Sequence, residues 1–120
     1  MVEQVVRLAV AMTVHEGKLE EFQKLAASMT EGAKAEPGTI GYEWFAHPDG
    51  KKFSLLETYV NAAAVEAHFT GPVIRQGVPG LVALCMVDRF EIFGDAGPKV
   101  REMAGGMGAV FFRSSIGLGR

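Results

Sequence analysis

The chain has 120 residues, a formal net charge of −2 at pH 7 and 48% apolar residues. This length is that of one domain, and this apolar fraction is typical of a packed core and excludes intrinsic disorder. Acidic and basic residues are interspersed, so the sequence gives no indication of a nucleic-acid or membrane partner. No apolar stretch approaches the roughly 18 residues that a membrane span needs.

The sequence also limits redox and metal chemistry. Cys85 is the only cysteine, which excludes an internal disulfide and a cysteine-pair metal site. The three histidines are scattered, and the motifs of serine hydrolases, zinc proteases, phosphate loops and CxxC sites do not occur. We therefore expect no metal, flavin or nicotinamide. Glu3 lies near the start without a basic flank or a cleavage site, so we expect a cytoplasmic protein without a signal peptide.

The first half of the chain predicts strand, helix, strand and strand. Residues 4–14 are rich in β-branched residues and predict a strand. Residues 15–38 change to a helical period, and the Pro-Gly pair at their end terminates the predicted helix. Residues 39–47 and 52–60 are predicted strands joined by a tight turn. The helical period is set by Leu19, Phe22, Leu25, Ala26 and Met29.

The second half predicts a short helix and a fourth strand. Asn61 is the expected N-cap of a helix over 62–69. Residues 72–76 are expected to add one further helical turn, which the glycines and proline at 77–80 end. Residues 81–94 then form the predicted fourth strand.

Residues 95–120 differ in amino-acid composition from the rest of the chain. They hold six glycines, a short helical candidate over 98–103 and an apolar patch over 109–112. We therefore divide the chain into one domain, 1–94, and a C-terminal extension, 95–120. The extension either docks on a partner subunit as an oligomerisation tail or is partly disordered.

The predicted order β-α-β-β-α-β is that of an α+β, ferredoxin-like fold with an antiparallel sheet. An antiparallel sheet with one solvated face alternates apolar and polar residues, but residues 5–14 and 81–87 are almost continuously apolar. Both faces of the sheet must then be covered, and two short helices cover only one. We expect the sheet of an identical subunit on the other face, giving a homodimeric α/β barrel; the alternative is cover by the C-terminal extension.

Strand alternation indicates a candidate pocket. Glu57 and Tyr59 share one face of their strand with two large apolar residues, and Tyr42 and Trp44 share a face of the preceding strand. If these side chains point the same way, they form an aromatic wall with polar tips, which suits a flat aromatic ligand. The alternative for Tyr42, Trp44 and Tyr59 is an ordinary place in the core.

His68 and Glu57 are the candidate proton-transfer groups. His68 lies beside an apolar helical stripe that includes Phe69, where an imidazole either transfers protons or makes a local hydrogen bond. Glu57 either pairs with Arg7 or Arg89 as a buried structural link or serves the pocket as acid or base. His15 and His47, near a strand end and a turn, are expected to be solvated.

A motif spread over residues 36–69 resembles the antibiotic biosynthesis monooxygenase domain family. The matching residues are Glu36, Pro37, Gly38, Tyr42, Asp49, Glu57, Tyr59, Ala64 and His68. The resemblance implies a dimeric α+β barrel with a pocket between sheet and helices. It also implies either a cofactor-free oxygenase acting on quinols and polyketide phenols or a haem-degrading relative. That haem-degrading branch favours asparagine on the first strand and tryptophan closing the third, where this chain has Gln4, Arg7 and Tyr59.

Together these features predict a cofactor-independent monooxygenase that oxidises a small electron-rich aromatic, such as a quinol, a polyketide phenol or an anthrone, with O₂. His68 is the expected base, with Glu57 polarising His68 or a water and Tyr59 orienting the substrate ring. The expected substrate-binding residues are Trp44, Tyr42, Phe69 and Arg89. The alternatives are a haem-binding or haem-degrading dimer and a non-catalytic barrel that binds a small ligand.

Overall fold

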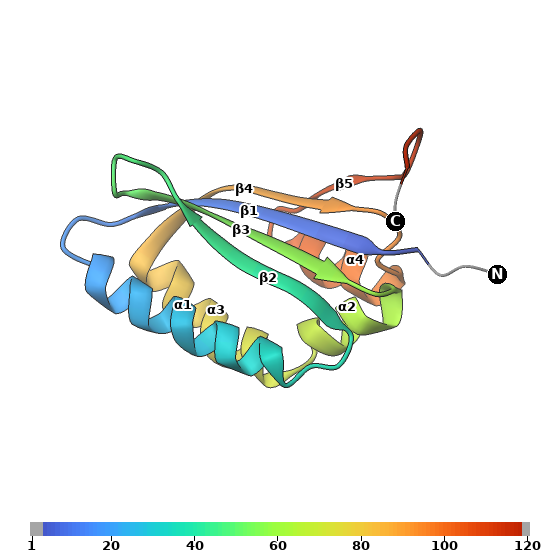
Figure 1. Cartoon of the computed structure of the whole chain (residues 1–120), viewed down its shortest axis with the longest axis horizontal. Helices are drawn as coiled ribbons and strands as arrows, with labels where there is room; N and C mark the ends of the chain where they lie inside the picture. Colours follow the sequence, from blue (N-terminus) through green and yellow to red (C-terminus); the bar gives the residue numbers. More distant parts are fainter. Residues whose placement is uncertain (1–3, 119–120) are drawn as a thin grey trace.

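The computed structural model describes residues 4–118 and has two layers, a five-stranded sheet and four helices that cover one of its faces (Figure 1). The strands are β1 (Val6–Val14), β2 (Thr39–Ala46), β3 (Lys52–Tyr59), β4 (Cys85–Phe93) and β5 (Val110–Phe112), and the helices are α1 (Leu19–Lys34), α2 (Ala62–Phe69), α3 (Pro72–Leu84) and α4 (Pro98–Gly106).

The sheet order is β2-β3-β1-β4-β5. Strands β1 to β4 pair antiparallel, and β5 adds a short parallel edge beside the end of β4. The predicted α+β class and ferredoxin-like order are confirmed. The expected N-cap is also present, since Asn61 Oδ1 accepts a hydrogen bond from the Ala64 backbone N–H at 2.9 Å.

The core lies between the sheet and the helices. On β3, Leu55, Glu57 and Tyr59 are buried on the helix-covered face, whereas Leu56 points to the other side, as strand alternation predicts. Within residues 4–118, no helix is both long and apolar enough to cross a membrane.

Helix α3 is the main difference from the sequence prediction. It was expected to end near residue 76, but it continues to Leu84, so β4 begins only at Cys85. The glycines that suggested a break instead allow α3 to lie close to α1. A Cβ at Gly77 would lie 2.6 Å from Met29 Cε, and one at Gly80 would lie 2.9 Å from Leu25 Cδ2. Packing between the two helices therefore outweighs the low helix propensity of glycine and proline.

The C-terminal extension packs against its own chain. In α4, Val100 and Ala104 are fully buried and belong to the same apolar cluster as Val6 and Ile92 of the sheet. Residues 113–118 follow β5 outside helices and strands, and Ile116 is 99% exposed. The extension thus contributes to the core through residue 112, and its role in assembly stays a prediction.

Residues 4–118 leave the second face of the sheet uncovered. Phe45 and Leu56 on this face are 50% and 45% exposed. Near the β4–β5 edge, Phe93 and Phe112 stack on each other with ring centroids 5.1 Å apart. Because α4 lies on the same side as the other helices (Figure 1), the alternative in which the extension covers this face is wrong.

Candidate active site

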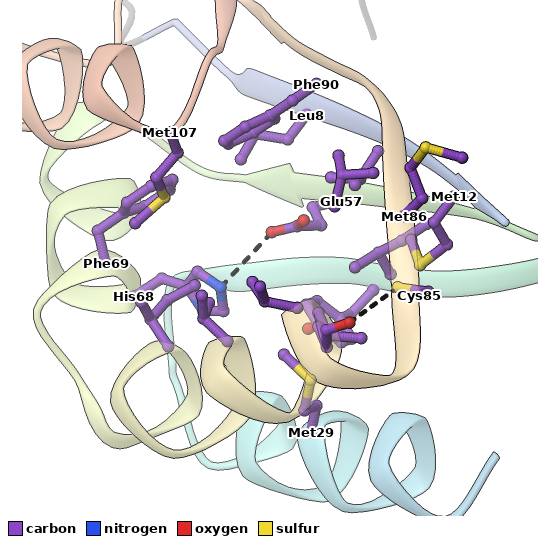
Figure 2. A pocket seen from close by; sticks show the side chains of 18 residues that line it. Leu8, Met12, Met29, Glu57, His68, Phe69, Cys85, Met86, Phe90 and Met107 are labelled. Atoms are coloured by element: carbon purple, nitrogen blue, oxygen red, sulfur yellow. Dashed lines mark hydrogen bonds and ion pairs between the residues drawn. The ribbon is translucent and has the colours of Figure 1, made fainter. Parts of the chain in front are cut away.

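A cavity of about 460 Å³ lies between the sheet and the helices, within the size range of small-molecule sites (Figure 2). Eighteen residues line it, and all but four are aliphatic, methionine or phenylalanine. The four exceptions are Tyr42, Glu57, His68 and Cys85. The cavity wall is therefore apolar except for a few side chains that can exchange protons.

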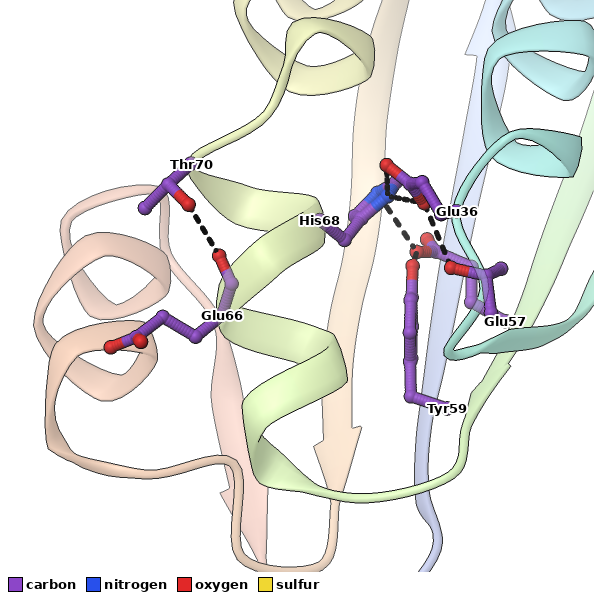
Figure 3. A network of polar contacts seen from close by, with 7 residues as sticks. Glu36, Glu57, Tyr59, Glu66, His68 and Thr70 are labelled. Carbon is purple, nitrogen blue, oxygen red and sulfur yellow. Dashed lines mark hydrogen bonds and ion pairs between the residues drawn. The ribbon is translucent and has the colours of Figure 1, made fainter.

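Helix α2 places His68 at the cavity, and the turn after α1 supplies its partner. His68 is 1% exposed, and its Nδ1 lies 2.8 Å from Glu36 Oε1 (Figure 3). Thr39 Oγ1 donates a second hydrogen bond to the same Glu36 oxygen at 2.8 Å. An ionised carboxylate only accepts hydrogen bonds, so Nδ1 carries the proton and Nε2 is left as the basic nitrogen. Glu36 thus orients the imidazole and stabilises its protonated form.

Glu57 lies on the other side of the imidazole. Its Oε1 is 3.5 Å from His68 Nε2 and accepts a hydrogen bond of 2.5 Å from Tyr59 Oη (Figure 3). Burial raises the pKa of Glu57, although His68 and the Tyr59 hydroxyl act in the opposite direction. Burial and the adjacent Glu57 raise the pKa of Tyr59, so this hydroxyl stays a donor. The result is a buried carboxyl that holds its proton to higher pH than an ordinary glutamate and can exchange it with a neighbouring group.

Tyr42 and Phe69 supply aromatic surface around these groups. Both line the cavity, and the Tyr42 ring centroid lies 5.8 Å from that of His68. Burial, followed by the charge of Glu57, raises the pKa of Tyr42 and keeps its hydroxyl neutral. A neutral phenol beside the imidazole can donate a hydrogen bond to a ligand oxygen.

Two expected substrate-binding residues lie outside the cavity wall. Trp44 Nε1 donates a hydrogen bond to Thr30 Oγ1 at 2.9 Å, and the indole packs against Phe22 of α1 rather than lining the cavity. Arg89 lies 3.0 Å from Glu91 on the uncovered face of the sheet, away from the cavity. Tyr59 is in the core behind Glu57 and is likewise absent from the wall.

The expected ion pair of Glu57 with an arginine is also wrong. Arg7 is paired in register with Thr58 and is exposed on the uncovered face, and Arg89 lies on that face as well. The parity of the strands separates both guanidinium groups from Glu57 by the thickness of the sheet. His15 and His47 are exposed, as expected from their positions.

Sequence reasoning assigned no role to Glu36 and missed one whole side of the cavity. Glu36 was part of the family motif, but its contact with His68 spans 32 positions and depends on how α2 packs against the preceding turn. Val82 was missed because residues 81–84 were assigned to the fourth strand and not to α3, whereas Met86 and Phe90 were placed on the right strand but given no role. A helical count continued past Pro79 would have placed Val78 and Val82 on one face.

The remaining polar wall residue, Cys85, is unsuited to nucleophilic chemistry. Its thiol donates to the Leu81 carbonyl at 3.1 Å, and burial raises the pKa of the thiol. Raising this pKa lowers the thiolate fraction that would react.

The haem alternative has one candidate axial ligand in the cavity wall. Nδ1 of His68 is bonded to Glu36, so only Nε2 could bind iron, and Glu57 lies 3.5 Å from that nitrogen. His15 and His47 do not line the cavity. Within residues 4–118, no group of three or more His, Cys, Asp or Glu side chains is placed to hold a metal ion.

Comparisons with known proteins agree with this architecture. MupZ from Pseudomonas fluorescens superposes with a TM-score of 0.82 at 22% identity, over 98% of this chain and 96% of that one. SnoaB from Streptomyces nogalater, described as a cofactor-independent oxygenase, superposes with a TM-score of 0.68 at 18% identity, over 78% and 95% of the two chains. At these identities, both similarities establish the fold alone.

Sequence comparison establishes the family. An uncharacterized protein from Synechocystis is 33% identical over 70 residues, which are 55% of this chain and 48% of that protein. The chain thus spans about half the length of this curated relative. The family model for antibiotic biosynthesis monooxygenases matches residues 5–79, which is more than half of the chain and includes Glu36, Glu57 and His68. The chain therefore belongs to the antibiotic biosynthesis monooxygenase family.

Proposed function

We propose that the chain is a cofactor-independent monooxygenase that oxidises a small electron-rich aromatic, such as a quinol, a polyketide phenol or an anthrone, with O₂. The observation that carries this proposal is the buried array Glu36–His68–Glu57 in the wall of an otherwise apolar cavity. Family membership supports a monooxygenase-type reaction, and the similarity to a cofactor-independent oxygenase is consistent with it.

The first step is removal of a proton from the substrate by His68 Nε2. Glu36 stabilises the imidazolium that forms, because its carboxylate already accepts the Nδ1 proton at 2.8 Å. The apolar walls keep water away from the substrate anion, which is then the electron donor for O₂. One electron passes from the anion to O₂, and the two radicals combine to form a C–O bond. The peroxide anion then takes the proton back from the His68 imidazolium, which gives a hydroperoxide and restores the neutral base.

The second step completes the oxidation without an external reductant. For an anthrone, the peroxide loses the remaining C–H proton to a base, and that electron pair forms the carbonyl while the O–O bond breaks. Glu57, whose pKa is raised by burial, gives a proton to the departing oxygen, which leaves as water. The balance is R₂CH₂ + O₂ → R₂C=O + H₂O. Tyr59 acts as a positioning residue, because it touches Glu57 and not the cavity.

Oxygen uptake by metal-free protein tests this proposal with anthrone and a panel of quinols. We expect one O₂ consumed for each anthrone oxidised. His68→Gln should lower kcat by roughly 10²–10⁴, the usual contribution of a general base. The matched control is His47→Gln, because His47 is exposed and lies away from the cavity.

Two results would count against the proposal. Full activity of His68→Gln would remove His68 as the base. Binding of these aromatics without any O₂ consumption would contradict the reaction class and favour a barrel that only binds a small ligand.

We also propose that two copies pair through the uncovered face of the sheet. This face carries Phe45 and Leu56, both about half exposed, and the stacked rings of Phe93 and Phe112 at one edge. Apolar side chains in such number on one face are typical of an interface. Pairing of this kind leaves the cavity on the helical side of each copy accessible.

A further inference from the structure

The cavity wall holds no cation. Among the residues that the structure describes, none of those lining the cavity is lysine or arginine. The rim is apolar as well, since Val82, Met86 and Met107 are exposed apolar residues that also line the cavity. Figure 2 shows Met86 and Met107 on opposite sides of it. A ligand that enters therefore meets no positive side chain on its way from solvent to His68.

The arginines of β1, α3, β4 and α4 do not line the cavity. Arg89 pairs with Glu91 on the uncovered face of the sheet, and the Arg101 guanidinium lies over the Phe111 ring, 4.5 Å from its centroid. Arg7 projects from the uncovered face. The sheet separates Arg7 and Arg89 from the cavity, and Arg75 and Arg101 are exposed residues outside its wall, so none of the four is placed as a counter-ion for a bound anion.

The polar groups at the cavity cannot supply a positive charge either. His68 is flanked by two carboxyl groups, at 2.8 Å to Glu36 and 3.5 Å to Glu57. With Glu36 ionised, the three groups together carry a net charge of zero or less, whichever of His68 and Glu57 holds a proton. An anionic ligand would lose its hydration and meet either no charge or a like charge.

We propose that the cavity selects an uncharged aromatic substrate and rejects carboxylated analogues of the same shape. This inference rests on the proposed function and names the substrate class for the same site. The substrate's only ionisation would then be the proton transfer to His68, after the ring is enclosed. Tyr42 and Glu57 suit the phenol or carbonyl edge of such a ring, because they offer neutral or proton-sharing groups.

Binding of two matched, unreactive probes tests this inference independently of turnover. The probes are anthraquinone-2-carboxamide and anthraquinone-2-carboxylate, which have nearly the same shape and differ in charge at pH 8. Calorimetric titration should show the carboxamide binding at least tenfold more tightly than the carboxylate. The carboxamide should also compete with anthrone in the oxygen-uptake assay.

A rim substitution gives a second readout. Val82 is 64% exposed on α3, so a longer side chain fits there without disturbing the core. Val82→Arg should bring the affinity for the carboxylate to within about threefold of that for the carboxamide. Val82→Gln, similar in length and neutral, should leave the tenfold difference unchanged.

The outcomes separate this inference from the proposed reaction. Equal affinity for the two probes, or no binding of the carboxamide, would overturn the inference. Preference for the carboxamide in a protein that consumes no O₂ would contradict the monooxygenase proposal while supporting the selection of uncharged ligands.

Discussion

The Glu57 side chain lies between the hydroxyl of Tyr59 and the imidazole of His68, deep on the helix-covered face of the sheet. Burial raises its pKa in the folded protein above the value of about 4.3 for an unperturbed glutamate. Between these two pKa values the folded state binds more protons than the unfolded state. The free energy of unfolding must therefore decrease as pH rises through this window.

This linkage gives a prediction for Glu57→Gln. The wild-type free energy of unfolding should fall from pH 4.5 upward until Glu57 is ionised in the folded state, by about 1.4 kcal/mol for each unit of pKa difference. Glu57→Gln keeps the shape of the side chain but cannot ionise, so this fall should disappear. Urea denaturation at a series of pH values measures it.

The matched control is Glu20→Gln, because Glu20 is exposed on α1, outside both the core and the proposed pairing face. Its pH dependence should follow that of the wild type. A Glu57→Gln profile parallel to the wild-type profile would show that burial does not perturb this carboxyl.

At the scale of elements, the site depends on how closely α2 approaches the turn before β2. That turn holds Glu36, and α2 holds His68. A Cβ at Gly38 would lie only 2.4 Å from Ala64 Cβ of α2, which is far inside van der Waals contact. Glycine at this position is what permits the two segments to bring Glu36 and His68 together.

Gly38→Ala should therefore destabilise the protein by roughly 1–3 kcal/mol, the usual cost of overpacking. It should also lower oxygen uptake, since α2 must move away from Glu36. Ala64→Gly alone should cost about 1 kcal/mol of helix propensity. The double variant should lose less free energy of unfolding than the two single variants lose in total, because without the Ala64 Cβ the new Cβ at position 38 no longer clashes. Additive effects would show that this contact does not set the position of α2.

The same elements show what the sequence could reveal. Helix α2 was predictable because Asn61 is a local cap and the next eight residues form helix without an interruption. Strand parity was equally local and placed Glu57 beside Tyr59 correctly. The full length of helix α3 was not predictable from local rules. Gly77 and Gly80 are typical of a helix break, and only their close packing against α1 explains why the helix continues through them.

The hydrogen-bond partner of His68 could not be predicted from the sequence for a related reason. The sequence suggested several partners for Glu57 and none for Glu36. Glu36 and His68 are 32 positions apart, and their contact forms only when α2 packs against the turn that holds Glu36. Arg89 was expected among the substrate-binding residues or as an ion-pair partner of Glu57. Its actual face depends on the register of β4, which shifts at a bulge opposite Ala11 and Met12.

For the whole molecule, the C-terminal extension offers a test of the domain boundary. Removal of residues 95–120 would expose the core that α4 covers, including Val6 and Ile92. This truncation should lower the free energy of unfolding by roughly 3 kcal/mol or more, since burying one large aliphatic side chain contributes about 1.5–3 kcal/mol. Removal of residues 113–120 alone should change stability little. Equal stability of the two truncations would mean that α4 and β5 do not belong to the folding unit.

Pairing of two copies through the uncovered face of the sheet is the remaining prediction at this scale. Leu56→Glu places a carboxylate midway along β3 on that face and leaves the helix-covered core untouched. Burying this charge between two sheets is unfavourable, so we expect a dimer of the wild type and a monomer of Leu56→Glu in sedimentation velocity at the same concentration. The control is Leu19→Glu, an exposed leucine at the start of α1, where an acidic residue is tolerated and the dimer should persist. A monomeric wild type, or a dimer that survives Leu56→Glu, would contradict pairing through this face, and the apolar runs of β1 and β4 would then require another explanation.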